Sequence, residues 1–470
     1  MRAIAASIAV AVALAVLAGC ATYAPAPIEP AKTAEAFAAR RLDASAVRDQ
    51  VARLLPEAAE PWPPAEWDRA GLLVVALADN GSLAVARAEV EAALAAKISA
   101  AETPNPTLGL QAEYARHEPD QWLYGISFDF LLPHRAVRTI DLEAAELGAA
   151  GARADLMEKT WDVRRALVAA LSERESAHRR LNATTRLGDA QDRLIALQQR
   201  RVDAGEDAPT DLNASQAARL DIEQQVASAR AEVVTADAAV AAALGVPVAA
   251  LDGVAIVWPD WGAPPAFVED RFSSAREAAL LSRADLASAI DAYAASEKKL
   301  ERAIARQYPQ FELKPGYYWD HGIAKWPFEI DFALPVFNRN EGEIAEAKAA
   351  REVAGQKLLA LEAGIYGEVD TALRADAVAS ESLDAAHRRG DSLRNQLAHA
   401  DAALKLGAGD SIDRTNAEVL VLRAALEAVQ AAAQRQSARN ALEDALHAPL
   451  SGPELKLAKA WTVAESGAGR

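Results

Sequence analysis

The sequence predicts a mainly α-helical protein in which a helix–strand–strand–helix unit occurs twice, so that four β-strands accompany long antiparallel coiled-coil hairpins. Three observations predict this fold class. Alanine dominates the apolar residues, which form 51% of the chain, whereas aromatic residues reach only 6%, and this favours long, closely packed helices. Two long segments lack proline and repeat apolar residues at helical spacing. Two shorter segments alternate apolar and polar residues, as strands do.

Composition and charge exclude several classes of protein. The chain has 470 residues and one cysteine, so it cannot contain a disulfide framework or a cysteine-rich zinc module. The net charge of −17 argues against a nucleic-acid partner, which would need a basic face. The apolar and charged shares are those of a folded chain and not of a disordered one.

The first 19 residues have the pattern of a lipoprotein signal peptide. Arg2 precedes a short apolar run that ends at Gly19, which is typical of a secretory signal. The tetrapeptide Leu17–Cys20 resembles the bacterial lipobox, in which cleavage before the cysteine leaves a lipid-modified Cys20. A chance cysteine behind an ordinary signal peptide is the alternative. The lipobox predicts a lipid-anchored protein, and Ala21 in place of an aspartate implies the outer membrane.

Internal repetition predicts a duplicated unit, because matching residues recur at a spacing of roughly 200 that stays constant to within one residue. The paired positions are Leu83 and Leu286, Pro106 and Pro309, Leu132–Pro133 and Leu334–Pro335, Gly205 and Gly407, Asp211 and Asp413, Leu244 and Leu446, and Pro247 and Pro449. We expect a signal peptide at 1–19, a lipidated extension at 20–66, repeat 1 at 67–247, a linker at 248–269, repeat 2 at 270–449 and a tail at 450–470.

Each repeat is expected to contain a long helical hairpin. No proline occurs in 135–208 or in 336–448, and a helix of about 68 residues would be on the order of 100 Å long. Gly205 and Gly407 are expected to end the first helix of each hairpin. The hairpin turns are therefore predicted near 203–211 and 405–413.

Four strands are expected, two in 105–132 and two in 309–335, each about 9–11 residues long, which suits a tilted strand that crosses a bilayer. One face is apolar and aromatic. Its expected residues are Leu108, Leu110, Ala112 and Tyr114, then Trp122, Tyr124, Ile126, Phe128 and Phe130, then Phe311, Leu313, Tyr317 and Trp319, then Trp326, Phe328, Ile330, Phe332 and Leu334. Pro315 and Pro327 each remove a backbone donor and are expected at strand ends or bulges.

The strands favour a membrane position over the alternative of a soluble sheet that covers a core on one face. Segments 104–134 and 308–337 hold 14 of the 26 aromatic residues, as a lipid-facing band would. The opposite face carries the charged residues Glu113, Asp129, Glu312, Lys314, Glu329 and Asp331. Four strands cannot close a barrel, and an open sheet edge is not viable in lipid. Three copies would supply twelve strands, although the strand count alone permits other copy numbers.

The lipobox, the duplicated unit and the glycine-to-aspartate turns resemble the lipoprotein branch of the outer-membrane efflux protein family, the TolC-like channels. The motifs that carry the resemblance are Asn105–Leu108, Leu334–Arg339 and Ala204–Leu212. It implies a homotrimer with a 12-stranded barrel and an α-helical periplasmic tunnel. It also implies a passive conduit without cofactors that works with a periplasmic adaptor and an inner-membrane pump. The transported substrate stays open among metal ions, drugs, dyes and proteins.

The resemblance further implies an acidic ring that gates the channel and favours cations. Asp211 and Asp413 match those positions, six residues after each turn glycine. The alternative is that each aspartate only caps the returning helix. Gly205, Asp207, Gly407 and Asp410 are the expected contacts at the periplasmic turns. An arginine that some relatives carry near the second turn is replaced by Gly409, so how the turns are held together stays open.

Two other classes of protein compete with a channel. An enzyme is disfavoured because the seven histidines show no metal-binding spacing and no nucleophile elbow or phosphate loop occurs, so we expect neither catalytic residues nor a metal site. A periplasmic coiled-coil structural or adaptor lipoprotein would explain the helices and the anchor. It would not explain four alternating, aromatic strands.

Overall fold

The computed structural model describes residues 22–132, 134–265, 283–455 and 457. They belong to two compact units, residues 1–41 and residues 42–470. The described part of the first unit contains α2 (Pro30–Ala38). The expected signal peptide and Cys20 lie outside the described residues, as do parts of the expected linker and tail.

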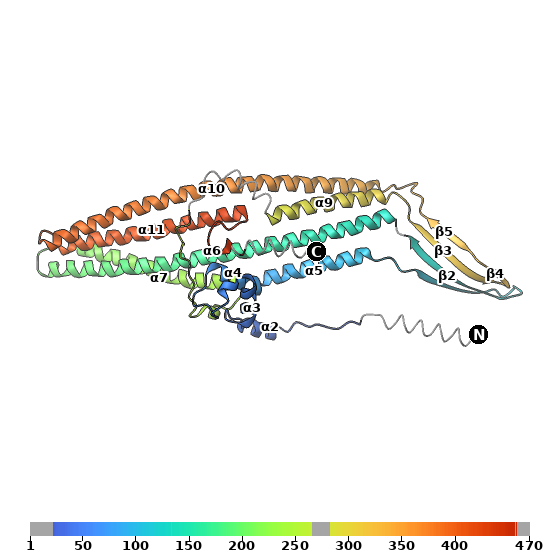
Figure 1. The fold of residues 1–470 in the computed structure, drawn as a ribbon, viewed down its shortest axis with the longest axis horizontal. Coiled ribbons are helices and arrows are strands. Elements are labelled where there is room, and N and C mark those ends of the chain that lie inside the picture. Colours follow the sequence, from blue (N-terminus) through green and yellow to red (C-terminus); the bar gives the residue numbers. More distant parts are fainter. Residues whose placement is uncertain (1–21, 133, 266–282, 456, 458–470) are drawn as a thin grey trace. The chain divides into compact units, whose positions relative to one another are not determined.

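The second unit contains one order of elements twice (Figure 1). It begins with α3 (Ser45–Leu54), the 3-10 helix η1 (Pro56–Ala58), α4 (Arg69–Asp79) and α5 (Gly81–Ala101). Then follow β1 (Thr107–Tyr114), β2 (Trp122–Leu132), α6 (Arg135–Asp203), α7 (Thr210–Leu244) and the 3-10 helix η2 (Val248–Leu251). The second series is α9 (Ala284–Ala305), β3 (Phe311–Asp320), β4 (Ile323–Lys325), β5 (Phe328–Phe332), α10 (Glu341–Lys405) and α11 (Ser411–Leu446). The predicted duplicated helix–strand–strand–helix fold is confirmed.

The hairpins consist of a very long helix followed by a shorter one. Helix α6 has 69 residues and α10 has 65, because no proline interrupts either segment and alanine at many contact positions lets neighbouring helices approach closely. Helices α7 and α11 return with 35 and 36 residues. Among the described residues no single helix is long and apolar enough to span a membrane; α4 and α5 pass that test only as a pair bent by 54°.

Each repeat has its own apolar core where the short first helix meets the hairpin. In the first repeat α4 is almost wholly buried against α6 and the end of α7, with Leu72 at 0% exposure, and Trp258 and Trp261 complete the cluster. In the second repeat Leu286 of α9 packs with side chains of α10 and α11. Leu83 and Leu286, paired in the sequence, are both buried, so the repeat spacing marks equivalent core positions.

The strands form one antiparallel sheet that joins the repeats. Strand β2 pairs with β1 and, across the repeats, with β3, while β4 and β5 both pair with β3. The register places Ile126 opposite both Leu110 and Tyr317, so the expected apolar residues share one face. In Figure 1 the sheet lies at one end of the long helices and the hairpin turns lie at the other.

The apolar face of the sheet is uncovered within the described chain. Leu110 is 77% exposed and Phe328 is 63% exposed. On the opposite face Lys314 pairs with Asp331 at 2.6 Å and with Glu312 at 3.2 Å. An apolar face of this extent on the outside of a sheet is typical of contact with lipid.

The fourth strand differs from the expected single run that included Trp326 and Leu334. It is divided into β4 and β5, with Trp326 and Pro327 between them, and it ends at Phe332. Two prolines explain the break. Pro315 of β3 pairs with Phe328 but has no N–H to donate, and Pro327 also has none. Gly316 N–H donates to the Pro327 carbonyl at 2.9 Å and keeps the two segments beside β3.

Candidate functional site at the hairpin turns

Two hairpin turns, residues 204–209 and 406–410, lie side by side at the end of the second unit that is remote from the sheet (Figure 1). The left-handed backbone of Gly205 (φ 73°) and Gly407 (φ 71°) ends α6 and α10, as predicted. Each glycine lies in a Schellman pattern, in which Glu206 N–H donates to the Arg201 carbonyl at 2.9 Å and Ala408 N–H donates to the Ala403 carbonyl at 2.9 Å. The two turns therefore share one backbone conformation.

Asp211 and Asp413 lie in the first turns of α7 and α11, and both are exposed. No hydrogen bond or ion pair of either side chain occurs among the described residues. The alternative that Asp211 and Asp413 cap these helices is wrong. Pro209 occupies the N-cap of α7 without a side-chain bond, and Asp410 caps α11 by accepting from Ile412 N–H at 3.0 Å. Their carboxylates are free, beside helix N-termini that favour negative charge.

Arg201, on the last turn of α6, joins the two hairpins. Its guanidinium forms an ion pair with Asp410 of the second turn, and we call this contact the cross-hairpin ion pair. It also contacts Asp207 at 2.9 Å and Glu206 at 3.5 Å, both in the first turn. One arginine therefore balances part of the charge of three carboxylates. Asp207 and Asp410, expected as turn contacts, are thus partly neutralised, in contrast to Asp211 and Asp413.

The absence of a side chain at Gly409 has a steric reason. A Cβ atom at this position would lie 2.8 Å from the Leu404 nitrogen and 3.0 Å from the Ala403 side chain. The second turn is too tight for any larger residue. The positive charge that pairs with the carboxylates of both turns is therefore supplied by the Arg201 side chain of the first hairpin.

Behind the turns, packing and ion pairs hold the hairpins against each other. Leu187 and Leu194 of α6 and Ile222 of α7 form a buried cluster with Val419 of α11. Next to this cluster, Arg193 of α6 pairs with Glu418 of α11 at 2.7 Å. The two hairpins therefore meet through α6 and α11 over several helical turns.

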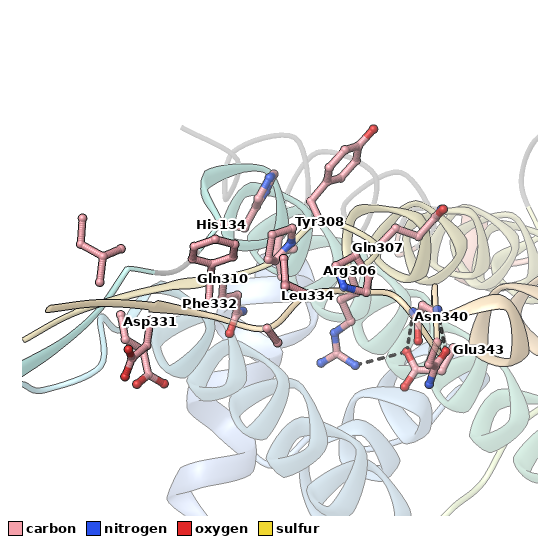
Figure 2. Close-up of a pocket in the computed structure, with 17 residues that line it drawn as sticks. His134, Arg306, Gln307, Tyr308, Gln310, Asp331, Phe332, Leu334, Asn340 and Glu343 are labelled. Carbon is pink, nitrogen blue, oxygen red and sulfur yellow. Dashed lines mark hydrogen bonds and ion pairs between the residues drawn. The ribbon is translucent and has the colours of Figure 1, made fainter.

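A second feature is a pocket of about 840 Å³ where the sheet joins the helices (Figure 2). His134 and Tyr308 stack at its rim, with ring centroids 6.1 Å apart. On the helical side Asn340 donates to the Ala303 carbonyl at 2.9 Å and to Glu343 at 3.1 Å. The adjoining exit from the sheet leaves Leu334 and Phe337 67% and 100% exposed, so this junction is not covered by the described chain.

Comparison with known proteins finds a family that matches part of the chain and solved structures that have a similar fold. Residues 72–246 match the family described as outer membrane efflux protein. No curated protein sequence matches the chain. Among solved structures, the fold is similar to that of CusC, with a TM-score of 0.65, 18% identity, and coverage of 80% of this chain and 91% of that one.

Two further outer-membrane proteins have the same fold. VceC of Vibrio cholerae superposes with a TM-score of 0.65 and 18% identity over 81% of this chain and 96% of that one. The CmeC outer membrane channel of Campylobacter jejuni does so with a TM-score of 0.66 and 15% identity over 83% of this chain and 88% of that one. The first repeat therefore matches the outer membrane efflux protein family over residues 72–246, and the fold of both repeats is shared with these solved outer-membrane proteins.

Proposed function

We propose that this protein is the outer-membrane channel of a tripartite efflux system. It forms a passive conduit that carries substrates from a periplasmic adaptor and an inner-membrane pump to the outside. One observation carries the proposal: an uncovered apolar sheet and a pair of long helical hairpins are parts of one compact unit. The sheet suits lipid, and the hairpins suit a tunnel in water. The pump supplies the energy, so the chain needs no catalytic residues and no cofactor.

The proposed assembly is a homotrimer. Within one chain β1 forms one edge of the sheet, and β4 with β5 forms the other. Unpaired edges are costly in lipid, and pairing of these edges between copies removes them. Four strand runs from each of three chains make a 12-stranded barrel. Neighbouring copies or lipid then cover exposed side chains such as Phe337. We further propose that the repeats span 67–247 and 270–449 and that Cys20 carries the lipid anchor.

The proposed gate lies at the hairpin turns. Asp211 and Asp413 are exposed and free of partners within the described chain, so a trimer would bring six carboxylates to one axis. A ring of carboxylates attracts cations and repels anions. Gly205, Asp207, Gly407 and Asp410 shape the surface that meets the adaptor. The cross-hairpin ion pair favours the arrangement in which the two turns lie together.

A periplasmic coiled-coil lipoprotein is the competing function. It would have no use for an uncovered sheet such as the one that includes Leu110 and Phe328. Protease treatment of intact outer membranes separates the two functions, because strands within a barrel are protected and strands of a periplasmic protein are not.

The first test is electron microscopy of the full-length protein, extracted from outer membranes in mild detergent. We expect a three-fold cylinder longer than roughly 100 Å, since the long helices alone reach that length. A monomeric rod or a compact particle would overturn the channel assignment. Single-channel recordings from the same preparation measure conduction directly, and a preparation of trimers without conductance would contradict the proposed conduit.

A further inference from the structure

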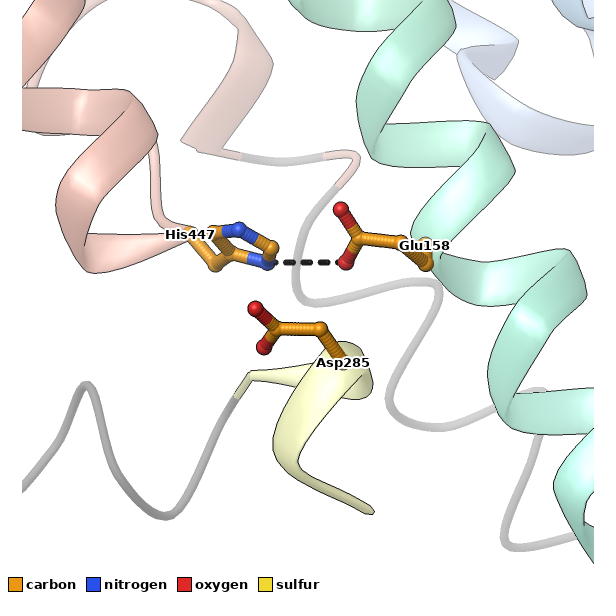
Figure 3. Close-up of side chains that lie close together, drawn as sticks. All are labelled: Glu158, Asp285 and His447. Atoms are coloured by element: carbon orange, nitrogen blue, oxygen red, sulfur yellow. Dashed lines mark ion pairs between the residues drawn. The ribbon is translucent and has the colours of Figure 1, made fainter. Parts of the chain in front are cut away.

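Three side chains of types that bind metal ions lie close together, far from the hairpin turns. Glu158 of α6, Asp285 at the start of α9 and His447 directly after α11 each present a donor atom, and these atoms lie within 4.8 Å of one another (Figure 3). Within the described residues this is the one group of three such donors. The three residues come from both repeats and are distant in the sequence, so only the fold brings them together.

The surroundings fix the histidine in place. Its side chain is 5% exposed, and its Nδ1 lies 3.5 Å from Glu158 Oε2. The Trp161 ring stacks on the imidazole with centroids 5.1 Å apart and an angle of 15°. His447 has a left-handed backbone (φ 46°) that turns the chain at the end of α11 and places the ring over α6. The imidazole is therefore positioned by backbone and packing on two sides.

Among the three candidate ligands, Glu158 has an oxygen without a hydrogen-bond partner within the described chain, whereas both oxygens of Asp285 accept hydrogen bonds. Glu158 Oε2 is buried and accepts no hydrogen bond within the described chain. Asp285 Oδ1 accepts from Arg283 at 3.0 Å and from Leu286 N–H at 2.8 Å, whereas Oδ2 accepts only from Arg283, at 2.6 Å, and keeps a second lone pair for a cation. A buried oxygen without a donor is costly unless a cation satisfies it.

We propose that Glu158, Asp285 and His447 bind a divalent transition-metal cation of the Zn²⁺ type. One imidazole and two carboxylates, with water in the fourth position, are ligands that such cations accept in tetrahedral sites. Bond lengths of about 2.1 Å give a separation of roughly 3.4 Å between neighbouring ligand atoms. The 3.5 Å between His447 and Glu158 already matches it, and a small shift of Asp285 completes the set.

The bound cation would connect α6 of the first repeat with both ends of the second. Asp285 begins the second repeat's first helix, and His447 follows its last one. The site lies along α6, remote from the turns that carry Asp211 and Asp413. It is therefore independent of the proposed gate and would stabilise the contact between repeats.

The test is zinc binding by full-length protein in detergent, without a histidine tag and after treatment with a chelator. Isothermal titration calorimetry should show one Zn²⁺ per chain with a dissociation constant in the micromolar range. Glu158→Gln and His447→Asn should each weaken binding at least 30-fold. Asparagine also adopts the left-handed backbone of position 447, so the turn after α11 is retained. His178→Asn is the control, because His178 faces Asp237 at 3.8 Å but has no third donor.

A second measurement does not depend on any variant. X-ray absorption at the zinc edge of the wild-type complex should show one imidazole among otherwise oxygen ligands, and His447→Asn should remove the imidazole signal. Less than one tenth of a Zn²⁺ per chain, or equal affinities of Glu158→Gln and wild type, would overturn the proposal. So would a wild-type spectrum without imidazole. Any of these three results would mean that Glu158, Asp285 and His447 do not bind a cation together, and the proposed channel would be unaffected.

Discussion

Removal of the Arg201 side chain is the most direct test of how the hairpin turns are held together. The cross-hairpin ion pair joins side chains that are 37% and 39% exposed, so solvent screens it strongly. Ion pairs of this kind contribute about 0.2–1 kcal/mol each. Three copies in a trimer give about 0.6–3 kcal/mol, which corresponds to a roughly 3- to 150-fold change in the ratio of closed to open channels.

The assay is single-channel recording in planar lipid bilayers. Arg201→Ala should raise the open probability or the mean conductance by a factor within that range, because the carboxylates of Asp207 and Asp410 then repel each other across the two turns. High salt should reduce the difference from wild type, since the pair is exposed. Arg200→Ala is the matched control: its neighbouring guanidinium donates only to the Ala196 carbonyl, at 3.2 Å, within the described chain.

A double-mutant cycle separates the ion pair from other effects of the substitutions. Asp410→Asn removes the charge but keeps an N-cap residue of similar quality for α11. If the pair matters, Arg201→Ala in the Asp410→Asn background should change conductance much less than it does alone. Wild-type conductance in Arg201→Ala, or an equal increase in Arg200→Ala, would refute the reasoning.

Three further predictions follow from the geometry of the turns and of the core. Asp211→Ala combined with Asp413→Ala should raise single-channel conductance and weaken cation preference in bilayer recordings, whereas unchanged selectivity would reject the gate. Gly409→Ala places a Cβ 2.8 Å from the Leu404 nitrogen and should cost about 1–3 kcal/mol of stability, measured as a lower denaturation midpoint. Burial raises the pKa of Asp444 to about 6, so its contribution to stability is present below its unfolded pKa and is lost as the pH rises through 6. Asp444→Asn should therefore stabilise the protein above that pH by up to about 3 kcal/mol and flatten the pH dependence of thermal unfolding.

Most of the fold could be predicted from the sequence, because the residue patterns that predict it are periodic and local. The spacing of paired positions such as Leu83 and Leu286 follows from two copies of one core, and proline-free segments translate directly into long helices. The division of the fourth strand could not be placed in the same way. Its break depends on Pro315 of β3 facing the residue after Pro327, and this pairing is set by the register of the sheet and not by either strand alone.

At the candidate site, only features that lie within a single hairpin turn could be predicted from the sequence. The turn glycines and Asp211 and Asp413 follow from a pattern in each repeat. Arg201 was missed because its partner Asp410 belongs to the other hairpin, although a single arginine beside an acidic turn was a usable signal. The group around His447 gave no signal, since each of its members comes from a different helix end or face.

The hairpin turns of the two repeats have the same backbone conformation but carry different charged residues. This difference allows an ion pair to form between the two turns. The residue of the second repeat that matches Arg201 is Ala403, and the residue of the first repeat that matches Asp410 is Ala208. Each half of the cross-hairpin ion pair is thus present in one repeat only, so the contact forms between unlike turns. Gly409 matches Asp207 and leaves the space that lets the second turn close on Ala403 and Leu404. Two copies of the second turn would bring acidic residues together without a cation, because Ala403 stands where the first repeat has Arg201. The difference between the repeats therefore provides one attractive contact between the two turns of each chain, and its partial exposure to solvent makes this contact weak.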